Sequence, residues 1–177
     1  MTFSWPALWA AITRFARARG ALPSTFAWNF AQGSVVPGPT ELMLVPLALA
    51  DPPRAGRLAV VATIGSVAGG CVAWGLGAAA FASVGRPMLA FLGANEATIA
   101  QVMALMATYG WLFIVTSTLT PLSTKAVSIA AGAAGMPLAV FATALTLGRA
   151  ARFGAVVLLL RTGAGILRRR AGRSLKP

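Results

Sequence analysis

The sequence predicts an all-α integral membrane protein that crosses the bilayer several times. Of its 177 residues, 58% are hydrophobic and 10% are charged, whereas about a quarter of the residues are charged in a soluble domain. The net charge of +12 arises because 15 Lys and Arg residues face only three acidic residues. Most of the basic residues lie at the ends of apolar segments or in the tail, which is typical of the cytoplasmic loops of membrane proteins. A nucleic-acid partner is therefore not expected.

The first 25 residues are expected to form an amphipathic helix in the plane of the membrane interface. Five apolar residues recur on one helical face, and two arginines point away from it. A helix with aromatic anchors and basic residues binds the headgroup region of a bilayer. A flanking segment without an interfacial role is the alternative. The apolar residues are Trp5, Leu8, Trp9, Ile12 and Phe15, and the arginines are Arg14 and Arg17.

An apolar segment, Phe26–Ala50, is long enough to cross a membrane but is interrupted by Pro37, Gly38 and Pro39. Proline removes a backbone donor and breaks a helix. Glu41 follows the break, and a carboxylate in apolar surroundings is costly to bury unless it is paired or protonated. Broken helices at membrane depth occur where they line a cavity or are buried in protein. Two half-helices in a re-entrant hairpin are therefore expected, and a kinked spanning helix is the alternative.

A membrane-spanning helix is predicted over Leu58–Ala82, which holds no charged residue. Gly65 and Gly69 lie four residues apart in this helix, so a second helix can approach it closely. We interpret these glycines as packing residues without a direct role in function. The broken segment and the span form a first unit, residues 26–85. Residues 86–110 are then expected to form a second, amphipathic surface helix that links the two halves.

The second unit, residues 111–160, repeats the plan of the first. Its apolar run is broken at Pro121, four residues before Lys125, just as Pro37 lies four residues before Glu41. Transporters are often built from such repeats, inverted across the membrane, with their sites at the breaks. An inverted repeat is therefore expected, with an acid at one break and a base at the other.

The last span, Leu138–Leu160, carries Arg149 and Arg152, which lie three residues apart and therefore on one helical face. A basic tail, residues 161–177, follows and suits a cytoplasmic anchor on anionic headgroups. If both broken segments are re-entrant, both termini lie in the cytoplasm with eleven basic residues, and only Arg86 lies outside. If both segments cross fully, ten basic residues lie in the cytoplasm and two lie outside. The positive-inside rule therefore favours re-entrance.

These motifs resemble the DedA family, also called the SNARE-associated or VTT-domain membrane proteins, and within it the short YqaA-like members. The resemblance covers Phe26 to Phe153. It implies a fold in which two re-entrant hairpins face each other across the membrane. The matching pieces are Val36-Pro37-Gly38-Pro39-Thr40-Glu41, Tyr109-Gly110, the run from Pro121 that ends in Ala130-Ala131-Gly132, Met136, Phe141 and Gly148-Arg149.

The same resemblance implies transport of an anionic lipid such as undecaprenyl phosphate across the bacterial inner membrane, in a process linked to the proton-motive force. Glu41 matches the family's hairpin acid. Lys125 stands where many members have arginine, and Gln32 stands about where many have a second acid. Gln32 cannot take up a proton, and Lys125 keeps the charge without the bidentate fork that suits phosphate. Membrane lipids are the expected partners, and a homodimer is expected because four membrane segments are few for an enclosed pathway.

The charged residues predict how such a lipid would bind. A phosphate in a dry site needs cations and backbone donors. Lys125, Arg149 and Arg152 supply the cations, and the N-terminal ends of the half-helices after the two breaks would supply N–H groups. Glu41 would pair with one base in the empty site and release it when Glu41 is protonated or displaced by phosphate. A purely structural ion pair between the hairpins is the alternative.

Other functions stay open at the level of the sequence. They are a proton-coupled exporter of small ions or solutes, a headgroup-insensitive lipid scramblase, and a membrane assembly factor. An enzyme is not expected, because the chain has no histidine, one cysteine and no cluster of carboxylates. For the same reason neither a metal site nor a cofactor is expected.

Overall fold

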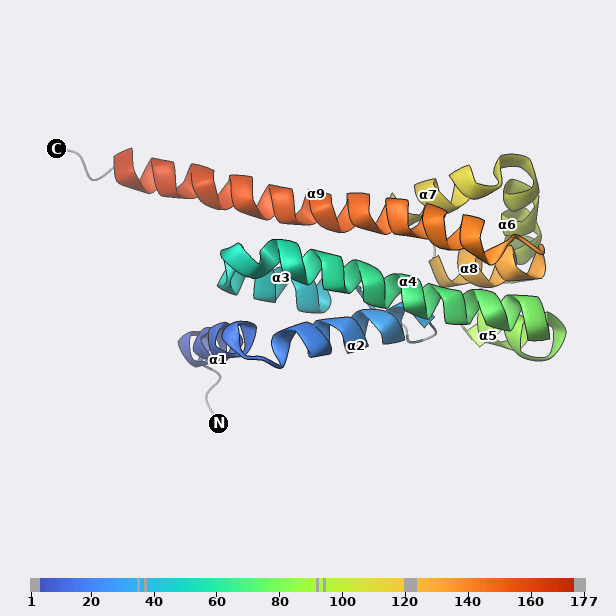
Figure 1. Cartoon of the computed structure of the whole chain (residues 1–177), viewed down its shortest axis with the longest axis horizontal. Coiled ribbons are helices and arrows are strands. Elements are labelled where there is room, and N and C mark those ends of the chain that lie inside the picture. The colour runs from blue at the N-terminus through green and yellow to red at the C-terminus, as the bar shows by residue number, and fades with distance from the viewer. Residues whose placement is uncertain are drawn as a thin grey trace.

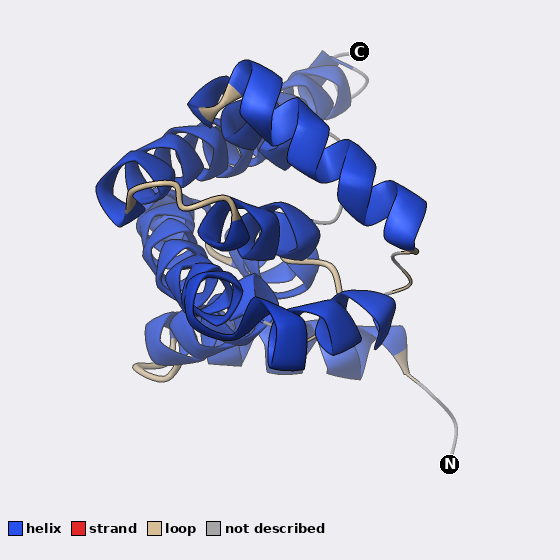
Figure 2. Cartoon of the chain, turned by 90° about the vertical axis from the view of Figure 1, so that its right-hand side faces the viewer, coloured by secondary structure: helices blue, strands red, loops and turns tan. Residues whose placement is uncertain are grey.

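The computed structural model describes residues 4–34, 36, 38–91, 93, 95–119 and 124–173, with the backbone alone for residue 119 and residues 164–173. Throughout these ranges helices are the only regular secondary structure, which confirms the predicted all-α class (Figure 1, Figure 2). The elements are α1 (Trp5–Arg17), α2 (Ala21–Ser34), α3 (Glu41–Ala50), the 3-10 turn η1 (Pro52–Arg54), α4 (Ala55–Ala80), the π-helical turn η2 (Phe81–Gly85), α5 (Arg86–Phe91), α6 (Glu96–Tyr109), α7 (Trp111–Leu119), α8 (Thr124–Ala133) and α9 (Leu138–Arg173).

Within the described ranges, two helical stretches are long and apolar enough to cross a membrane. Pro52–Phe91 joins η1, α4, η2 and α5 over 40 residues, and Leu138–Gly163 is the first 26 residues of α9. At a rise of about 1.5 Å per residue, even the shorter stretch exceeds the ~30 Å of a hydrocarbon core. Both predicted spans, Leu58–Ala82 and Leu138–Leu160, lie inside these stretches.

Both apolar segments that the sequence predicts to be broken are broken. Helix α2 ends at Ser34 and α3 begins at Glu41, while α7 ends at Leu119 and α8 begins at Thr124. In Figure 1, α3 runs back in the direction from which α2 came, and α8 runs back after α7 in the same way. The two pairs start from opposite ends of the molecule, so both breaks lie near its middle.

Gly38 and Pro39 belong to the first break, and two contacts fix their position. Gly38 has φ +149°, which favours glycine, and a Cβ there would lie 2.7 Å from Nε2 of the buried Gln32. The indole Nε1 of Trp28 donates a hydrogen bond to the carbonyl oxygen of Pro39 at 3.3 Å. Side chains of α2 thus hold the break in place. The other predicted break residues, Pro37 and Pro121, lie outside the described residues.

Helix α4 packs against α2 with almost no side chain between the two backbones. A Cβ on Gly69 of α4 would strike the carbonyl oxygen of Phe30, and a Cβ on Gly33 of α2 would strike the carbonyl oxygen of Ser66. A Cβ on Gly65 would lie 2.6 Å from another carbonyl oxygen of α2. Small residues permit this close approach and allow Cα–H groups to contact carbonyls. The packing role predicted for Gly65 and Gly69 is therefore confirmed.

Helix α8 packs against the other half of α4 in the same reciprocal way. A Cβ on Gly77 of α4 would strike the carbonyl oxygen of Ile129, and a Cβ on Gly132 of α8 would strike that of Trp74. In both interfaces each glycine follows, by three residues, a carbonyl that faces the partner's glycine. Helix α4 therefore packs against α2, the first helix of the first broken segment, and against α8, the second helix of the second broken segment.

The linker between the two halves differs from the single surface helix that the sequence predicts. Helix α5 ends at Phe91, and α6 begins at Glu96. Gly93 lies between them with φ +85°. Asn95 caps α6, because its Oδ1 accepts a hydrogen bond from the backbone N–H of Thr98 at 2.8 Å. A positive φ and a helix cap close together end one helix and start another.

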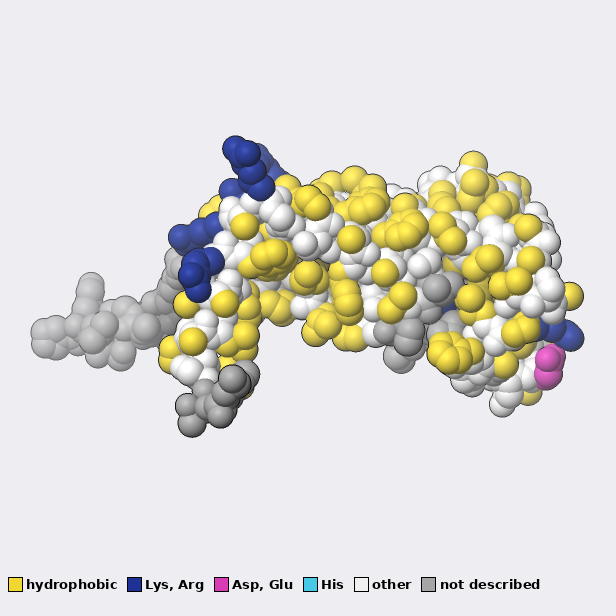
Figure 3. All heavy atoms as spheres, turned by 90° about the horizontal axis from the view of Figure 1, so that it is seen from below, with side chains coloured by type: hydrophobic (Ala, Val, Ile, Leu, Met, Phe, Trp, Pro, Cys, Tyr) yellow, Lys and Arg dark blue, Asp and Glu magenta, His cyan; other side chains and the backbone are white. Residues whose placement is uncertain are grey.

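Charged side chains gather at the two ends of the face shown in Figure 3, and an apolar belt lies between them. The end that holds α1 and the start of α4 is basic. At the opposite end Arg86 Nη2 lies 3.5 Å from Glu96 Oε2. Helix α1 covers Trp5–Arg17 of the predicted N-terminal helix, and α2 already begins at Ala21. The Trp5 and Trp9 side chains of α1 are 73% and 47% exposed. This distribution suits a chain whose middle faces lipid.

Replacing Gly77 by alanine is expected to destabilise the protein, because the new methyl group would collide with the Ile129 carbonyl. Overpacking of this kind costs about 1–3 kcal/mol. Gly75 is the matched control, since a Cβ there would meet no atom within 4 Å. Thermal unfolding in detergent should show a lower midpoint for Gly77→Ala only. Equal midpoints for the two variants would contradict the close contact between α4 and α8.

Candidate functional site

One arginine joins three helices where the two breaks meet. Arg152 of α9 donates a hydrogen bond through Nε to Oε1 of Glu41 at 2.7 Å, and its Nη2 forms an ion pair with the same oxygen at 2.7 Å. Its Nη1 donates to the carbonyl oxygen of Thr118 at 2.8 Å. Glu41 is the first residue of α3, and Thr118 lies in the last turn of α7. The Arg152 guanidinium therefore ties α9 to the start of α3 and to the end of α7.

Helix dipoles favour this arrangement. The N-terminal end of a helix carries a partial positive charge and the C-terminal end a partial negative charge. The Glu41 carboxylate at the start of α3 and the Arg152 guanidinium at the end of α7 each meet the opposite sign. The Glu41 and Arg152 side chains are 23% and 33% exposed, so solvent screens the attraction between their charges only in part.

Arg149 lies one turn before Arg152 on α9 and is far more buried. Only 4% of its surface is exposed, and its guanidinium carbon lies 6.0 Å from the ring centre of Phe153. Its Nε has no hydrogen-bond partner among the described residues. Arg152 repels its charge and Glu41 attracts it. A buried guanidinium with an unused donor is costly.

Lys125 adds a further positive charge to this region. It is the second residue of α8 and is half-buried. Its charge and that of Arg149 repel each other. A cation at a helix N-terminus also meets the positive end of the dipole. Lys125, Arg149 and Arg152 together outweigh the single carboxylate of Glu41, so the centre of the protein is positive.

The structure thus brings together the four charged residues that the sequence singles out. Of the possible partners of Glu41, Arg152 forms the ion pair. Thr118 and Phe153 are additional residues of this site that the sequence analysis does not select. The i, i+4 spacing of Arg149 and Phe153 is a signal for a cation–π contact. The contact to the Thr118 carbonyl has no such signal, because it uses the backbone.

The comparison with family models gives a match to the VTT domain over residues 33–162, which is most of the chain. The chain belongs to the VTT-domain family. This domain is that of the DedA and SNARE-associated proteins, as the motifs at the breaks predict. Its members are generally membrane proteins regarded as transporters or flippases, and the VTT family is not known for enzymes. Neither the comparison with curated proteins nor that with solved structures found a match.

The Glu41–Arg152 pair is expected to stabilise the fold by an amount that a double-mutant cycle can measure. Glu41→Gln and Arg152→Gln should each destabilise the protein, and the double variant should lose less than their sum. The expected coupling is about 0.5–3 kcal/mol. The free energy of unfolding of each variant in detergent gives this value.

The pair of Arg86 and Glu96 supplies the control for this cycle. The Glu96 side chain is 74% exposed, and an exposed pair contributes about 0–1 kcal/mol. Glu96→Gln should therefore change the free energy of unfolding little. Strictly additive losses for Glu41→Gln and Arg152→Gln would show that these two side chains do not interact.

Proposed function

We propose that this VTT-domain protein carries an anionic lipid, of the polyprenyl phosphate class that includes undecaprenyl phosphate, across the bacterial inner membrane. The observation that carries the proposal is Arg149, a guanidinium that is 4% exposed and has an unused Nε donor among the described residues. Hydrogen bonds between a guanidinium and a phosphate are stronger than those between neutral groups, and a dry site strengthens them further. A phosphate would satisfy this donor and offset the excess positive charge.

Arg152, Arg149 and Lys125 have different roles in this proposal. Arg152 uses Nε, Nη1 and Nη2 in contacts with Glu41 and Thr118. Arg149 is therefore the first ligand of the phosphate, and Lys125 at the start of α8 contributes its charge. The N-terminal end of α8 favours an anion as well, because its dipole is positive there.

Glu41 couples this site to protons in the proposal. A neutral Glu41 no longer balances the charge of Arg152, so protonation weakens the tie between α3 and α9. A phosphate that approaches Arg152 competes with the same carboxylate for the same N–H groups. Either event releases the two breaks from each other, which lets the site open toward one side of the membrane.

The broken segments are re-entrant in the proposed membrane arrangement, and the two units form an inverted repeat. Helices α3 and α8 have 10 residues each, and at about 1.5 Å per residue each covers only about half of a ~30 Å hydrocarbon core. The matching elements of the two units also pack in the same way, because Gly69 of α4 lies against α2 and Gly148 of α9 lies against Thr118 of α7. The basic end then faces the cytoplasm together with both termini.

Labelling of single cysteines from either side of the membrane tests this arrangement. In a Cys71→Ser background, Pro53→Cys should react from the same side as Ser4→Cys, and Ala97→Cys, at an exposed position of α6, should react from the opposite side. Full crossing of both broken segments makes the reverse prediction, with the Ala97 position on the side of Ser4 and the Pro53 position opposite. That result would overturn re-entrance.

Binding of a polyprenyl phosphate to the protein in nanodiscs tests the proposed substrate class. Arg149→Gln should weaken binding at least tenfold relative to wild type, because it removes the buried cation. Arg161→Gln is the matched control on α9, since Arg161 is exposed and donates one long hydrogen bond, to the Pro52 carbonyl at 3.4 Å. The uncharged polyprenol should bind both variants and the wild type alike. Equal binding of the phosphate by Arg149→Gln and wild type would overturn the proposal.

A further inference from the structure

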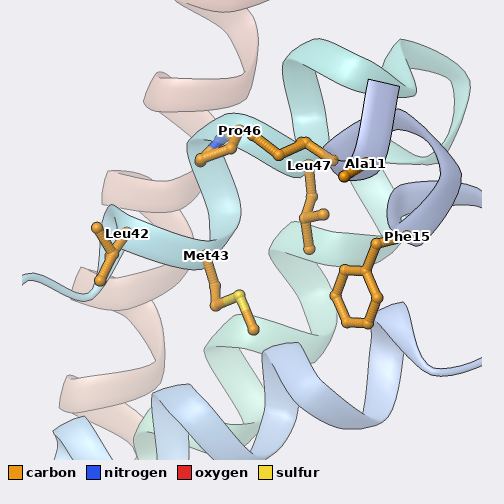
Figure 4. A pocket seen from close by; sticks show the side chains of 7 residues that line it. Ala11, Phe15, Leu42, Met43, Pro46 and Leu47 are labelled. Carbon is orange, nitrogen blue, oxygen red and sulfur yellow. The ribbon is translucent and has the colours of Figure 1, made fainter. Parts of the chain in front are cut away.

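An apolar groove of about 360 Å³ lies between α1 and α3. Six of the side chains that line it are labelled in Figure 4, and each belongs to an apolar residue type. The groove is open along one side, so a ligand can enter it laterally rather than through a closed channel. The labelled residues are Ala11 and Phe15 of α1 and Leu42, Met43, Pro46 and Leu47 of α3.

The inner end of this groove lies next to the charged site. Leu42 directly follows Glu41, whose carboxylate forms a hydrogen-bonded ion pair with Arg152 of α9. Figure 4 shows Leu42 on the side of the groove toward α9, with Phe15 on the far side. From Leu42 to Leu47 the groove follows α3 for about 7–8 Å, at the usual rise per residue. The inner end of the groove is therefore one residue along α3 from the Glu41–Arg152 pair, and Arg149 lies one turn from Arg152 on α9.

We propose that this groove holds the first part of the hydrocarbon chain of the lipid whose phosphate is bound at Arg149. The inference rests on the proposed function and adds a subsite for the chain. An amphiphile with an anionic head and one chain matches the neighbouring cations and the apolar walls together. A helix of another protein would match the groove alone and leave the positive charge at its inner end without a counterion.

Helix α1 thereby becomes part of the substrate site. Ala11 and Phe15 lie outside residues 33–162, the range that matches the VTT domain. They are placed against α3 because α1 packs on it, and Arg54 holds the end of α1 by donating to the carbonyl oxygen of Arg17 at 2.8 Å. The groove therefore predicts that affinity depends on chain length as well as on the phosphate.

Filling the groove from α1 tests the inference with little risk to the fold. Ala11 is exposed, so Ala11→Trp adds a ring over the groove without displacing a buried side chain. Ala10→Trp is the matched control, because Ala10 is the exposed neighbour that does not line the groove. Leu42→Trp, at a residue that is 55% exposed, fills the inner end independently. Thermal midpoints in detergent establish that the variants fold.

The probes are undecaprenyl phosphate and a five-carbon isoprenyl phosphate, each titrated into protein in nanodiscs. Ala11→Trp and Leu42→Trp should weaken binding of the long phosphate at least tenfold and leave the short one within twofold of wild type. Ala10→Trp should change neither. Wild-type affinity of both groove variants for the long phosphate would overturn the inference. If Arg149→Gln still weakens both phosphates in that case, the proposed function stands; if it weakens neither, the proposed function fails as well.

Discussion

The Arg152 guanidinium is the contact on which the arrangement of the molecule's centre depends. Each broken segment is interrupted near the middle of an apolar protein. Helix ends and a carboxylate without partners would be costly there. Arg152 meets the Glu41 carboxylate at the start of α3 and the Thr118 carbonyl at the end of α7. Arg152 thus ties both breaks to α9. Glycine contacts on α4 hold α2 and α8 of the same segments, whereas Arg152 ties α3 and α7 to α9.

The charges at this centre do not cancel, and the excess is positive. Arg152 is engaged with Glu41 and Thr118, whereas the Nε of Arg149 has no partner among the described residues. A purely structural ion pair between Glu41 and Arg152 does not require Arg149, a second and more deeply buried arginine, beside it. The surplus is explained if an anion completes the site during function, and a lipid phosphate is such an anion. The apolar groove beside Leu42 adds a place for the chain of such a lipid.

Much of the fold follows from local features of the sequence. The Pro-Gly-Pro break before Glu41 and the charge-free run in Leu58–Ala82 predict helix ends and a span that the structure contains. The apolar spacing in residues 86–110 predicts one linker helix, but the structure has two, because Gly93 adopts a positive φ between α5 and α6. The partner of Glu41 could not be chosen from sequence, because Lys125, Arg149 and Arg152 offer the same charge and Arg152 lies 111 residues away. The groove cannot be predicted from the sequence either, because it depends on how α1 packs against α3.

The most direct test of the central claim is a distance between the lipid phosphorus and the Arg149 side chain. Solid-state NMR of the protein in bilayers, with ¹⁵N-labelled arginine and a polyprenyl phosphate, measures the ³¹P–¹⁵N dipolar coupling. The account predicts a coupling to a guanidinium nitrogen that corresponds to hydrogen-bond contact and disappears in Arg149→Gln. Retention of the full coupling in Arg149→Gln, with its loss in Arg161→Gln, would place the phosphate at the surface and contradict the account.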